Sequence, residues 1–373
     1  MLTKTPISEL RERLHQFPEL SENEEKTAGF IADFFSELSY KIHREVGFHG
    51  IVASKRYGSG KTIAFRAELD ALPIDEESER AYKSQNEGVS HSCGHDGHMA
   101  ILLDLALRFE KTEELTGEVV FIFQSAEENG QGAEQMIGRE ELVNLEIHRC
   151  FALHNIPGEP LGSVHYKTGS FACASVGVDL KVRGKSSHAA HPEFGINALS
   201  IASEGLQKIQ KIQDQCPEGE FTLITPIAMK SGKRAFGTVP SDATLLVTMR
   251  AEKSEILEGM MDEVKAIVKG LEDQYKARLK LSFKEYFPAT VNFDDEGLLK
   301  EICVENKSQY VEMDRPFRWS EDFGFFRKCF PILMFGLGSG ESQPHLHAAN
   351  FDFPNEIIEN GSDIFYRLYN SYQ

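Results

Sequence analysis

The chain contains 373 residues, 41% of them hydrophobic, and carries a formal net charge of −18. This length is typical of two domains with ordinary hydrophobic cores, and the acidic excess argues against nucleic acid as a ligand. No apolar run approaches the ~20 residues of a membrane span, and the N-terminal residues lack the apolar core of a signal peptide. The sequence therefore predicts a cytoplasmic protein that binds neither nucleic acid nor membrane.

The first part of the chain alternates segments with helical and strand-like patterns. Ser21–Glu24 has the pattern of a capping box, which predicts the start of a helix over Glu22–Leu38. A second helix is expected over the apolar segment Met99–Phe109. The β-branched, aromatic or alternating runs that predict strands are Lys61–Arg66, Glu118–Gln124 and Cys150–His154. Strands that alternate with helices predict an α/β sheet covered by helices on both faces.

The middle of the chain has a different order of elements. Its segments follow the order β-α-β-β-α-β, with strands expected over Ser175–Val182, Phe221–Met229, Ala243–Arg250 and Arg278–Phe283 and helices over Asn197–Gln213 and Ser254–Gln274. This order is typical of a ferredoxin-like α+β domain. The last part returns to the earlier pattern, with a strand over Phe330–Phe335 and a helix near Asn355–Tyr369. We therefore predict a discontinuous first domain over residues 1–173 and 288–373, and a second domain inserted over residues 174–287.

Residue types that bind metals recur at the ends of the predicted strands. The densest group is His91–His98, which holds three of the thirteen histidines, a cysteine and an aspartate. Further candidates of this kind are Asp70, Glu127, Glu128, His154 and His347. Sites in open α/β sheets form at strand ends, and imidazole, thiolate and carboxylate groups bind divalent metals. An isolated histidine would be structural and an isolated glutamate pair a solvated loop, but recurrence at strand ends favours a metal site.

Motifs along nearly the whole chain resemble those of one group of hydrolases. The matching motifs are Leu14–Leu20, Arg66–Pro73, His91–His98, Gln124–Glu128, Leu153–His154, Gly184–Ala189, Pro192–Ala198, Ser320–Phe323 and His345–His347. In order and spacing they are similar to the metal-dependent amidohydrolases and metallopeptidases that include hippurate hydrolases, bacterial aminoacylases, acetyldiaminopimelate deacetylases and plant auxin-conjugate hydrolases. The resemblance implies an α/β fold with a phosphorylase/hydrolase-like zinc-exopeptidase catalytic domain. It also implies that the inserted ferredoxin-like domain acts as a lid and forms a homodimer.

The resemblance further implies roles for individual residues. The positions that match the ligands of two divalent metal ions are Cys93, His95, Glu128, His154 and His347, with the cysteine at the position that bridges the metals. Glu127 matches the general base, and its alternatives are a further metal ligand or a surface charge. Asp70 matches a carboxylate that supports and orients the ligands. The neighbouring His91, Asp96 and His98 are expected to support the ligands or to pack.

Two residues of the inserted domain match positions that contact substrate. His188 matches a histidine that reaches the substrate carbonyl, often across a dimer interface; the alternative is a histidine that stabilises its own loop. Arg250 matches an arginine that could pair with a substrate carboxylate, and its alternative is a surface charge at a strand end. Relatives usually carry an asparagine where this chain has Gly237. We therefore do not expect the usual substrate contact at that position.

The resemblance implies an enzyme that hydrolyses the amide bond of an N-acyl amino acid or a related small amide. Thiolate and imidazole ligands suit zinc, with manganese as an equal candidate and cobalt or nickel as further alternatives. The competing interpretations are a dipeptidase or carboxypeptidase with the same mechanism, and a non-catalytic metal-binding relative. Glu127 favours an enzyme, because a non-catalytic scaffold needs no general base.

Overall fold

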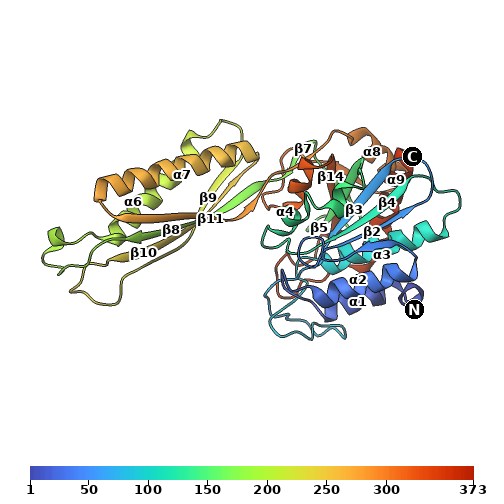
Figure 1. Cartoon of the computed structure of the whole chain (residues 1–373), viewed down its shortest axis with the longest axis horizontal. Helices are drawn as coiled ribbons and strands as arrows, with labels where there is room; N and C mark the ends of the chain where they lie inside the picture. The colour runs from blue at the N-terminus through green and yellow to red at the C-terminus, as the bar shows by residue number, and fades with distance from the viewer. The chain divides into compact units, whose positions relative to one another are not determined.

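The computed structural model describes the backbone of residues 1–373 and every side chain except that of Glu296. The described chain forms two compact units (Figure 1). Unit 1 comprises Met1–Phe171, Thr290–Pro316 and Glu321–Gln373, and unit 2 comprises Ala172–Ala289 and Phe317–Ser320. The catalytic, lid and dimerisation roles expected for the two domains stay predictions. In the part of the chain that the structure describes, none of the helices has the length and hydropathy of a membrane-spanning segment.

Unit 1 is built on a large mixed sheet, for which the described residues give the strand order β1-β2-β4-β3-β5-β14-β6-β13. The strands are β1 (Lys41–His43), β2 (Ile51–Arg56), β3 (Thr62–Glu68), β4 (Glu118–Gln124), β5 (Arg149–Pro157), β6 (Val164–Tyr166), β13 (Tyr310–Glu312) and β14 (Ile332–Gly340). The four central strands β4, β3, β5 and β14 run parallel. Every residue of β3 and β4 is buried, as expected for parallel strands covered on both faces. The short strands β7 (Gly169–Ala172) and β12 (Thr290–Asn292) form a separate pair.

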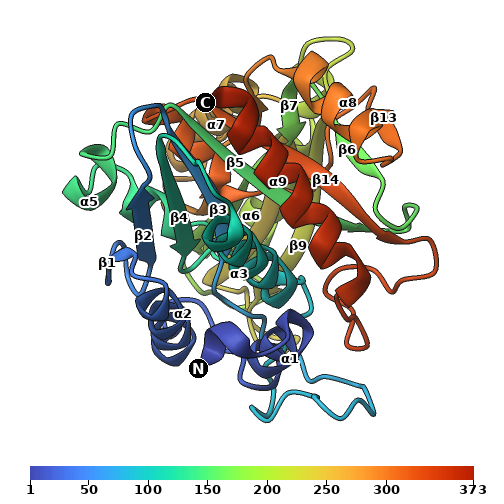
Figure 2. The ribbon, with the colours of Figure 1, turned by 90° about the vertical axis from the view of Figure 1, so that its right-hand side faces the viewer.

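Helices cover both faces of the large sheet, as the sequence predicts. The helices of unit 1 are α1 (Ile7–Gln16), α2 (Glu25–Glu37), α3 (His95–Lys111), α4 (Gly132–Met136), α5 (Glu140–Val143), α8 (Glu296–Glu305) and α9 (Ile358–Tyr372). On one face α3 and α9 lie side by side (Figure 2). There Phe65 of β3 packs against Phe365 of α9, with 5.0 Å between ring centroids. On the other face α4 packs against the 3-10 helix η4 (Asp322–Lys328).

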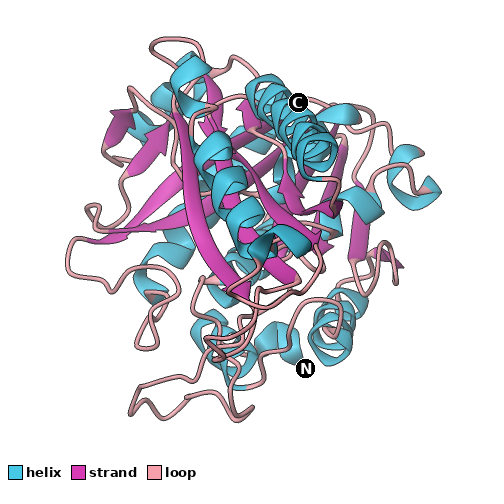
Figure 3. Ribbon diagram, turned by 90° about the vertical axis from the view of Figure 1, so that its left-hand side faces the viewer, coloured by secondary structure: helices cyan, strands magenta, loops and turns pink.

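Unit 2 contains a second sheet with the strand order β11-β8-β10-β9, in which every neighbouring pair is antiparallel. Its elements are β8 (Ala174–Arg183), α6 (Ala198–Gln210), β9 (Thr222–Ser231), β10 (Asp242–Ala251), α7 (Ser254–Tyr275) and β11 (Arg278–Phe287). The two helices pack against each other and against the strands (Figure 3). This order of elements and strands confirms the predicted ferredoxin-like arrangement.

The predicted capping box at the start of α2 is wrong. Helix α2 begins at Glu25 and has no side-chain cap from its N-terminal residue. The carboxylate of Glu19 takes that role, since its Oε2 accepts hydrogen bonds from the amides of Lys26 at 2.9 Å and Thr27 at 2.8 Å. Ser21, expected as the cap, instead donates a hydrogen bond to another part of unit 1. The pattern correctly indicated a nearby helix start, but a carboxylate six residues before the helix caps it in place of the expected serine hydroxyl.

Candidate active site

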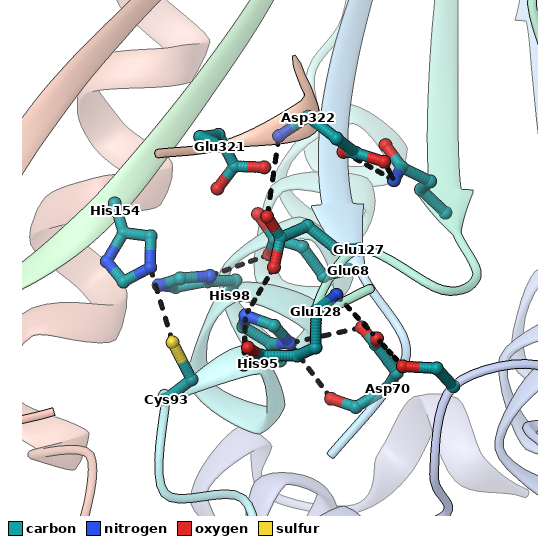
Figure 4. Close-up of polar contacts among 12 residues, drawn as sticks. Glu68, Asp70, Cys93, His95, His98, Glu127, Glu128, His154, Glu321 and Asp322 are labelled. Carbon is teal, nitrogen blue, oxygen red and sulfur yellow. Dashed lines mark hydrogen bonds and ion pairs between the residues drawn. The ribbon is translucent and has the colours of Figure 1, made fainter. Parts of the chain in front are cut away.

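Five side chains of unit 1 gather at the ends of the central strands, and Figure 4 labels all of them except His347. They are Cys93, His95, Glu128, His154 and His347, which we call the ligand cluster. The structure brings them together in overlapping groups of three whose potential ligand atoms lie within 4.8 Å of one another. All five were singled out by the resemblance, and their role as metal ligands stays a prediction.

The start of helix α3 positions two members of the cluster. The sequence placed this helix over Met99–Phe109, but it begins at His95, four residues earlier. Gly94 precedes it with a φ of 96°, and a Cβ at this position would lie 2.4 Å from the amide oxygen of Asn155. A glycine is therefore required both by the left-handed turn and by the close approach. The turn brings Cys93 and His95 to the same side of the site.

Hydrogen bonds orient the histidines of the cluster. His95 Nδ1 lies 2.9 Å from the carbonyl oxygen of Asp70, so its Nε2 points toward Glu127 and Glu128, whose nearest oxygens are 3.9 and 3.8 Å away. His154 Nδ1 lies 2.9 Å from a backbone carbonyl, and its Nε2 lies 3.5 Å from Cys93 Sγ. In both rings Nδ1 donates its proton to a backbone carbonyl. This contact fixes the tautomer in which Nε2 has no proton and can act as a ligand in the site.

The loops after β4 and β14 complete the cluster. The amide of Glu128 donates to Asp70 Oδ2 at 2.9 Å, which fixes the backbone beside this carboxylate. Ser21 donates to the same oxygen at 2.8 Å. Glu128 Oε2 lies 3.8 Å from Nε2 of His347, whose backbone has a φ of 65° and whose amide donates to Ser92 O at 2.8 Å. Asp70 thus holds the ring of His95 and the backbone of Glu128 in position, as expected for a residue that orients ligands.

The electrostatics of the cluster favour a bound cation. Burial, together with Glu128 and Glu127, raises the pKa of the Cys93 thiol well above its usual range. Burial and Asp70 raise the pKa of Glu128 to about 7, although His95 opposes this shift. Closely spaced buried acids cannot all ionise without a compensating positive charge. A divalent cation would supply that charge and hold the thiolate and carboxylates in their ionised forms.

Unpaired atoms provide an independent test of whether a metal fits. Among the described residues, His95 Nε2 and Glu128 Oε1 are buried and have no hydrogen-bond partner. Leaving such atoms unpaired costs free energy, and a metal ion would satisfy both. Thiolate, imidazole and carboxylate groups are the ligands expected for zinc and related divalent ions. The residues present therefore fit divalent metal ions.

Glu127 lies beside the cluster in a strongly acidic environment. Its Oε1 accepts a hydrogen bond from the amide of Asp322 at 3.4 Å. Burial, followed by the carboxylates of Glu321 and Glu128, raises its pKa well above the usual range. A carboxylate with a raised pKa is a better proton acceptor near neutral pH.

A buried arginine network behind Glu127 was not identified from the sequence. Arg66 Nη2 donates to Glu321 Oε1 at 2.8 Å and to Asp322 Oδ1 at 2.9 Å, and its Nη1 contacts Glu68. It also donates to the side-chain oxygen of Gln124 at 2.9 and 2.8 Å. Ser320–Phe323 stood out as a matching motif, but its partner Arg66 lies more than 250 residues earlier in the chain. That separation explains why no local pattern indicated the contact.

His98 and Asp96 of the His91–His98 segment make supporting contacts, whereas both ring nitrogens of the buried His91 lack a hydrogen-bond partner among the described residues. His98 Nδ1 lies 2.7 Å from Glu68 Oε2, and its Nε2 lies 2.7 Å from the amide oxygen of Asn155. Asp96 Oδ2 accepts hydrogen bonds from Arg11 at 3.0 Å and from His15 at 2.9 Å. These contacts join α1 and α3 directly beneath the cluster.

The buried contact between His15 and Asp96 predicts a pH-dependent stability. Burial opposes the charged imidazole, but Asp96 and Glu76 raise the pKa of His15 to about 9. Because this pKa is raised above its unfolded value of 6.5, the stabilisation is full below pH 6.5 and is lost as the pH rises through 9. We expect a loss on the order of 3 kcal/mol in unfolding free energy across this range. Denaturant unfolding at pH 6 to 9.5 measures it, and the same pH slope in His15→Gln would contradict the assignment.

The two predicted substrate contacts lie in unit 2. His188 is exposed, and its Nδ1 accepts a hydrogen bond from the amide of Ala190 at 3.0 Å. Arg250, at the end of β10, donates to Ser320 Oγ at 2.9 Å and to Arg318 O at 3.0 Å. At Gly237 a Cβ would meet no heavy atom within 4 Å, so a larger side chain would find space there. The substrate-binding roles of His188 and Arg250 stay predictions.

An α/β sheet that gathers buried thiolate, imidazole and carboxylate groups at its strand ends is the architecture of a metal-dependent hydrolytic enzyme. Comparison with known proteins agrees with this class. The chain belongs to peptidase family M20/M25/M40, whose model matches residues 64–371. The predicted family, fold class and enzymatic nature are therefore confirmed, and the candidate ligand groups support divalent metals as cofactors.

Individual relatives match nearly the whole chain. YhaA of Bacillus subtilis (strain 168), named as an amidohydrolase, is 32% identical over 359 residues, which cover 94% of this chain and 90% of the relative. A hippurate hydrolase of Campylobacter jejuni is 28% identical over 371 residues, covering 97% and 95%. A solved structure of the Bacillus subtilis YXEP protein, described as a dinuclear metal binding peptidase, has a TM-score of 0.81 at 24% identity, covering 97% and 96%. This last likeness shows a shared fold.

Proposed function

We propose that the protein hydrolyses the amide bond of an N-acyl amino acid or a related small amide. The observation that carries this proposal is the position of Glu127, a buried carboxylate of raised pKa beside the ligand cluster. The names of two relatives, an amidohydrolase and a hippurate hydrolase, support the same substrate class. A hippurate is an N-acyl amino acid, so the proposed bond type is the one that such a relative cleaves.

The ligand cluster and Glu127 have separate tasks in the proposed reaction. Cys93, His95, Glu128, His154 and His347 would hold two divalent ions. Such ions lower the pKa of water and polarise a carbonyl group. Glu127 accepts the proton of the attacking water and then delivers it to the leaving nitrogen, which is a poor leaving group unless protonated. Asp70 keeps His95 and the backbone of Glu128 in place during both transfers.

His188 and Arg250 would contact the substrate. We propose that His188 donates a hydrogen bond to the developing oxyanion of the substrate carbonyl and that Arg250 pairs with a substrate carboxylate. We further propose a homodimer in which each His188 serves the other subunit's site. Mixing His188→Ala with Glu127→Gln subunits then restores part of the activity, because one site in each heterodimer has both residues. An inactive, purified heterodimer would argue against the trans role.

A substrate panel tests the proposed function. N-acetyl amino acids, N-benzoyl amino acids and dipeptides are assayed with zinc, manganese, cobalt and nickel added separately to metal-free protein. We expect hydrolysis of the N-acyl amino acids with at least one metal, and loss of activity when a chelator removes it. Hydrolysis of dipeptides alone would favour the dipeptidase alternative. Activity that persists in protein shown to be metal-free would contradict the mechanism.

A further inference from the structure

His347 is held in the ligand cluster differently from the other histidines. Its side chain is 51% exposed, whereas those of His95 and His154 are buried. Among the described residues no hydrogen bond orients its ring, and its amide is fixed by Ser92 O at 2.8 Å. The position of this ring therefore depends on the segment that carries it, residues 341–354 between β14 and the 3-10 helix η5 (Asn355–Ile357), which we call the His347 loop.

The potential ligand atoms of the cluster divide into two groups that differ in burial. Cys93, His95 and His154 form one group, which we call the inner trio, and all three are buried. Cys93 also belongs to a second group with Glu128 and His347, the outer trio, which contains the exposed histidine. An ion held by the outer trio would therefore depend on the His347 loop, and an ion held by the inner trio would not.

Asp352 ties the His347 loop to two other segments of unit 1. Arg11 of α1 donates from Nη1 to Asp352 Oδ1 at 2.8 Å. The other carboxylate oxygen, Oδ2, accepts a hydrogen bond from the hydroxyl of Tyr82 at 2.8 Å and pairs with Arg80 Nε at 3.1 Å. The guanidinium carbon of Arg11 also lies 4.8 Å from the centre of the Tyr82 ring, a cation–π distance. We call these four residues the clamp.

The segment on the other side of the clamp, residues 76–82, is itself fixed. Glu76 is 7% exposed, and its Oε2 accepts a hydrogen bond from the amide of Ser84 at 2.7 Å. The amide of Glu77 donates to the carbonyl oxygen of Ala349 at 2.7 Å, two residues beyond His347. The clamp therefore fastens the His347 loop to a segment that has its own stabilising contacts.

The strength of the clamp bears on metal binding through conformational entropy. Its central ion pair is shielded from water, since the side chains of Arg11 and Asp352 are 0% and 14% exposed, and hydrogen bonds between charged groups are stronger than neutral ones. A ligand on a mobile loop loses conformational freedom when it binds, and this loss weakens binding. A loop that is fixed beforehand avoids most of that cost.

We propose that Asp352 is a positioning residue of the metal site, whose clamp orders the His347 loop and sets how tightly the outer trio holds its ion. This inference rests on the proposed function, because it requires that the ligand cluster holds two divalent ions. It goes further by assigning control of one ion to a residue outside the cluster. The ion of the inner trio does not depend on the clamp.

Release of zinc to a chromogenic chelator tests the proposal. The zinc-loaded wild type should release its metal in two phases, and the faster phase, from the outer trio, should be absent in His347→Ala. Asp352→Asn is expected to accelerate the fast phase about tenfold, the scale on which partners of metal ligands act, and to leave the slow phase unchanged. Tyr82→Phe removes one hydrogen bond of the clamp and should accelerate the same phase about threefold.

The matched control is Asp363→Asn. Asp363 on α9 also pairs with two arginines, Arg108 at 3.0 Å and Arg367 at 2.7 Å, and its side chain is 21% exposed. It resembles Asp352 in its ion pairs but belongs to neither the clamp nor the His347 loop. Both phases of zinc release should therefore be the same as in the wild type.

Asp352→Asn should remain folded, because Phe351 and Phe353 on either side are each 1% exposed and keep this part of the loop packed. Denaturant unfolding checks this, and Tyr82→Phe carries the test if the first variant unfolds. An unchanged fast phase would overturn the proposal. So would equal acceleration of both phases, which is the result of a general loss of structure.

The same measurements separate this proposal from the proposed function. A wild type that binds two equivalents of zinc and hydrolyses N-acyl amino acids, with release unaffected by Asp352→Asn, would contradict the clamp alone. Selective acceleration of the fast phase in a protein that hydrolyses none of the tested amides would support the clamp and contradict the proposed function. Fewer than two equivalents of zinc in the wild type would contradict both.

Discussion

Replacing Glu127 with glutamine is expected to lower kcat by roughly 1,000-fold, the scale of general acid–base catalysis. Glutamine keeps the size of the side chain and can still accept the hydrogen bond from the amide of Asp322. It cannot take up the proton of the attacking water. Metal content should stay the same, because the predicted ligands are all present. Steady-state kinetics and metal analysis of the purified variant measure the two effects separately.

The control for this variant is Glu134→Gln, which changes an exposed glutamate on α4. It should leave both kcat and metal content unchanged. Full activity of Glu127→Gln would refute the assignment of the general base. Loss of metal together with activity would instead identify Glu127 as a ligand, the alternative that the sequence left open.

Replacing Arg66 with methionine is expected to lower the free energy of unfolding by about 3–5 kcal/mol. Arg66 is 1% exposed and contacts the carboxylates of Glu68, Glu321 and Asp322. Methionine retains the apolar stem but leaves three buried carboxylates without their counter-charge. Denaturant unfolding at constant pH measures the loss.

The pH dependence of the Arg66 variant gives a further check. In the native protein, burial already raises the pKa of Asp322 to about 8, with Arg66 opposing the shift. Without the arginine, the buried acids must bind protons to stay folded, so the variant loses stability as the pH rises from 6 to 8. Arg56→Met is the matched control, because Arg56 pairs with Glu118 but its side chain is 52% exposed; it should cost less than about 1 kcal/mol. Equal losses in both variants would contradict the role of the buried network.

The sequence predicted the elements whose pattern is local. Strand β4 has the predicted bounds, because a β-branched and aromatic run stands between Gly117 and Ser125. Helix α3 was predicted to begin four residues too late. Its first turn contains His95, Asp96 and His98, whose polarity argues against burial in a helix. Contacts from distant segments make that turn buried, and hydropathy cannot detect them.

In the candidate site, too, the sequence indicated single residues but not the contacts between distant segments. Histidines, a cysteine and glutamates at strand ends could be noticed one by one, and the resemblance grouped five of them. The structure then brought them within reach of one another. The contact of Arg66 with Glu321 spans 255 positions, and the contact of Glu24 with the amide of Ala126 spans 102. Neither leaves a periodic signal in the sequence, because each depends on how strands are ordered in the sheet.

The place of β14 in the large sheet has a consequence for how the protein is made. This strand lies between β5 and β6 but is encoded after every strand of unit 2. During translation, the smaller sheet therefore has all its strands while the larger one still lacks a central strand. His347 emerges later still, so a nascent chain holds Cys93, His95, Glu128 and His154 without it. Capture of metal by all five predicted ligands together would therefore be a late step, after most of the chain has been made.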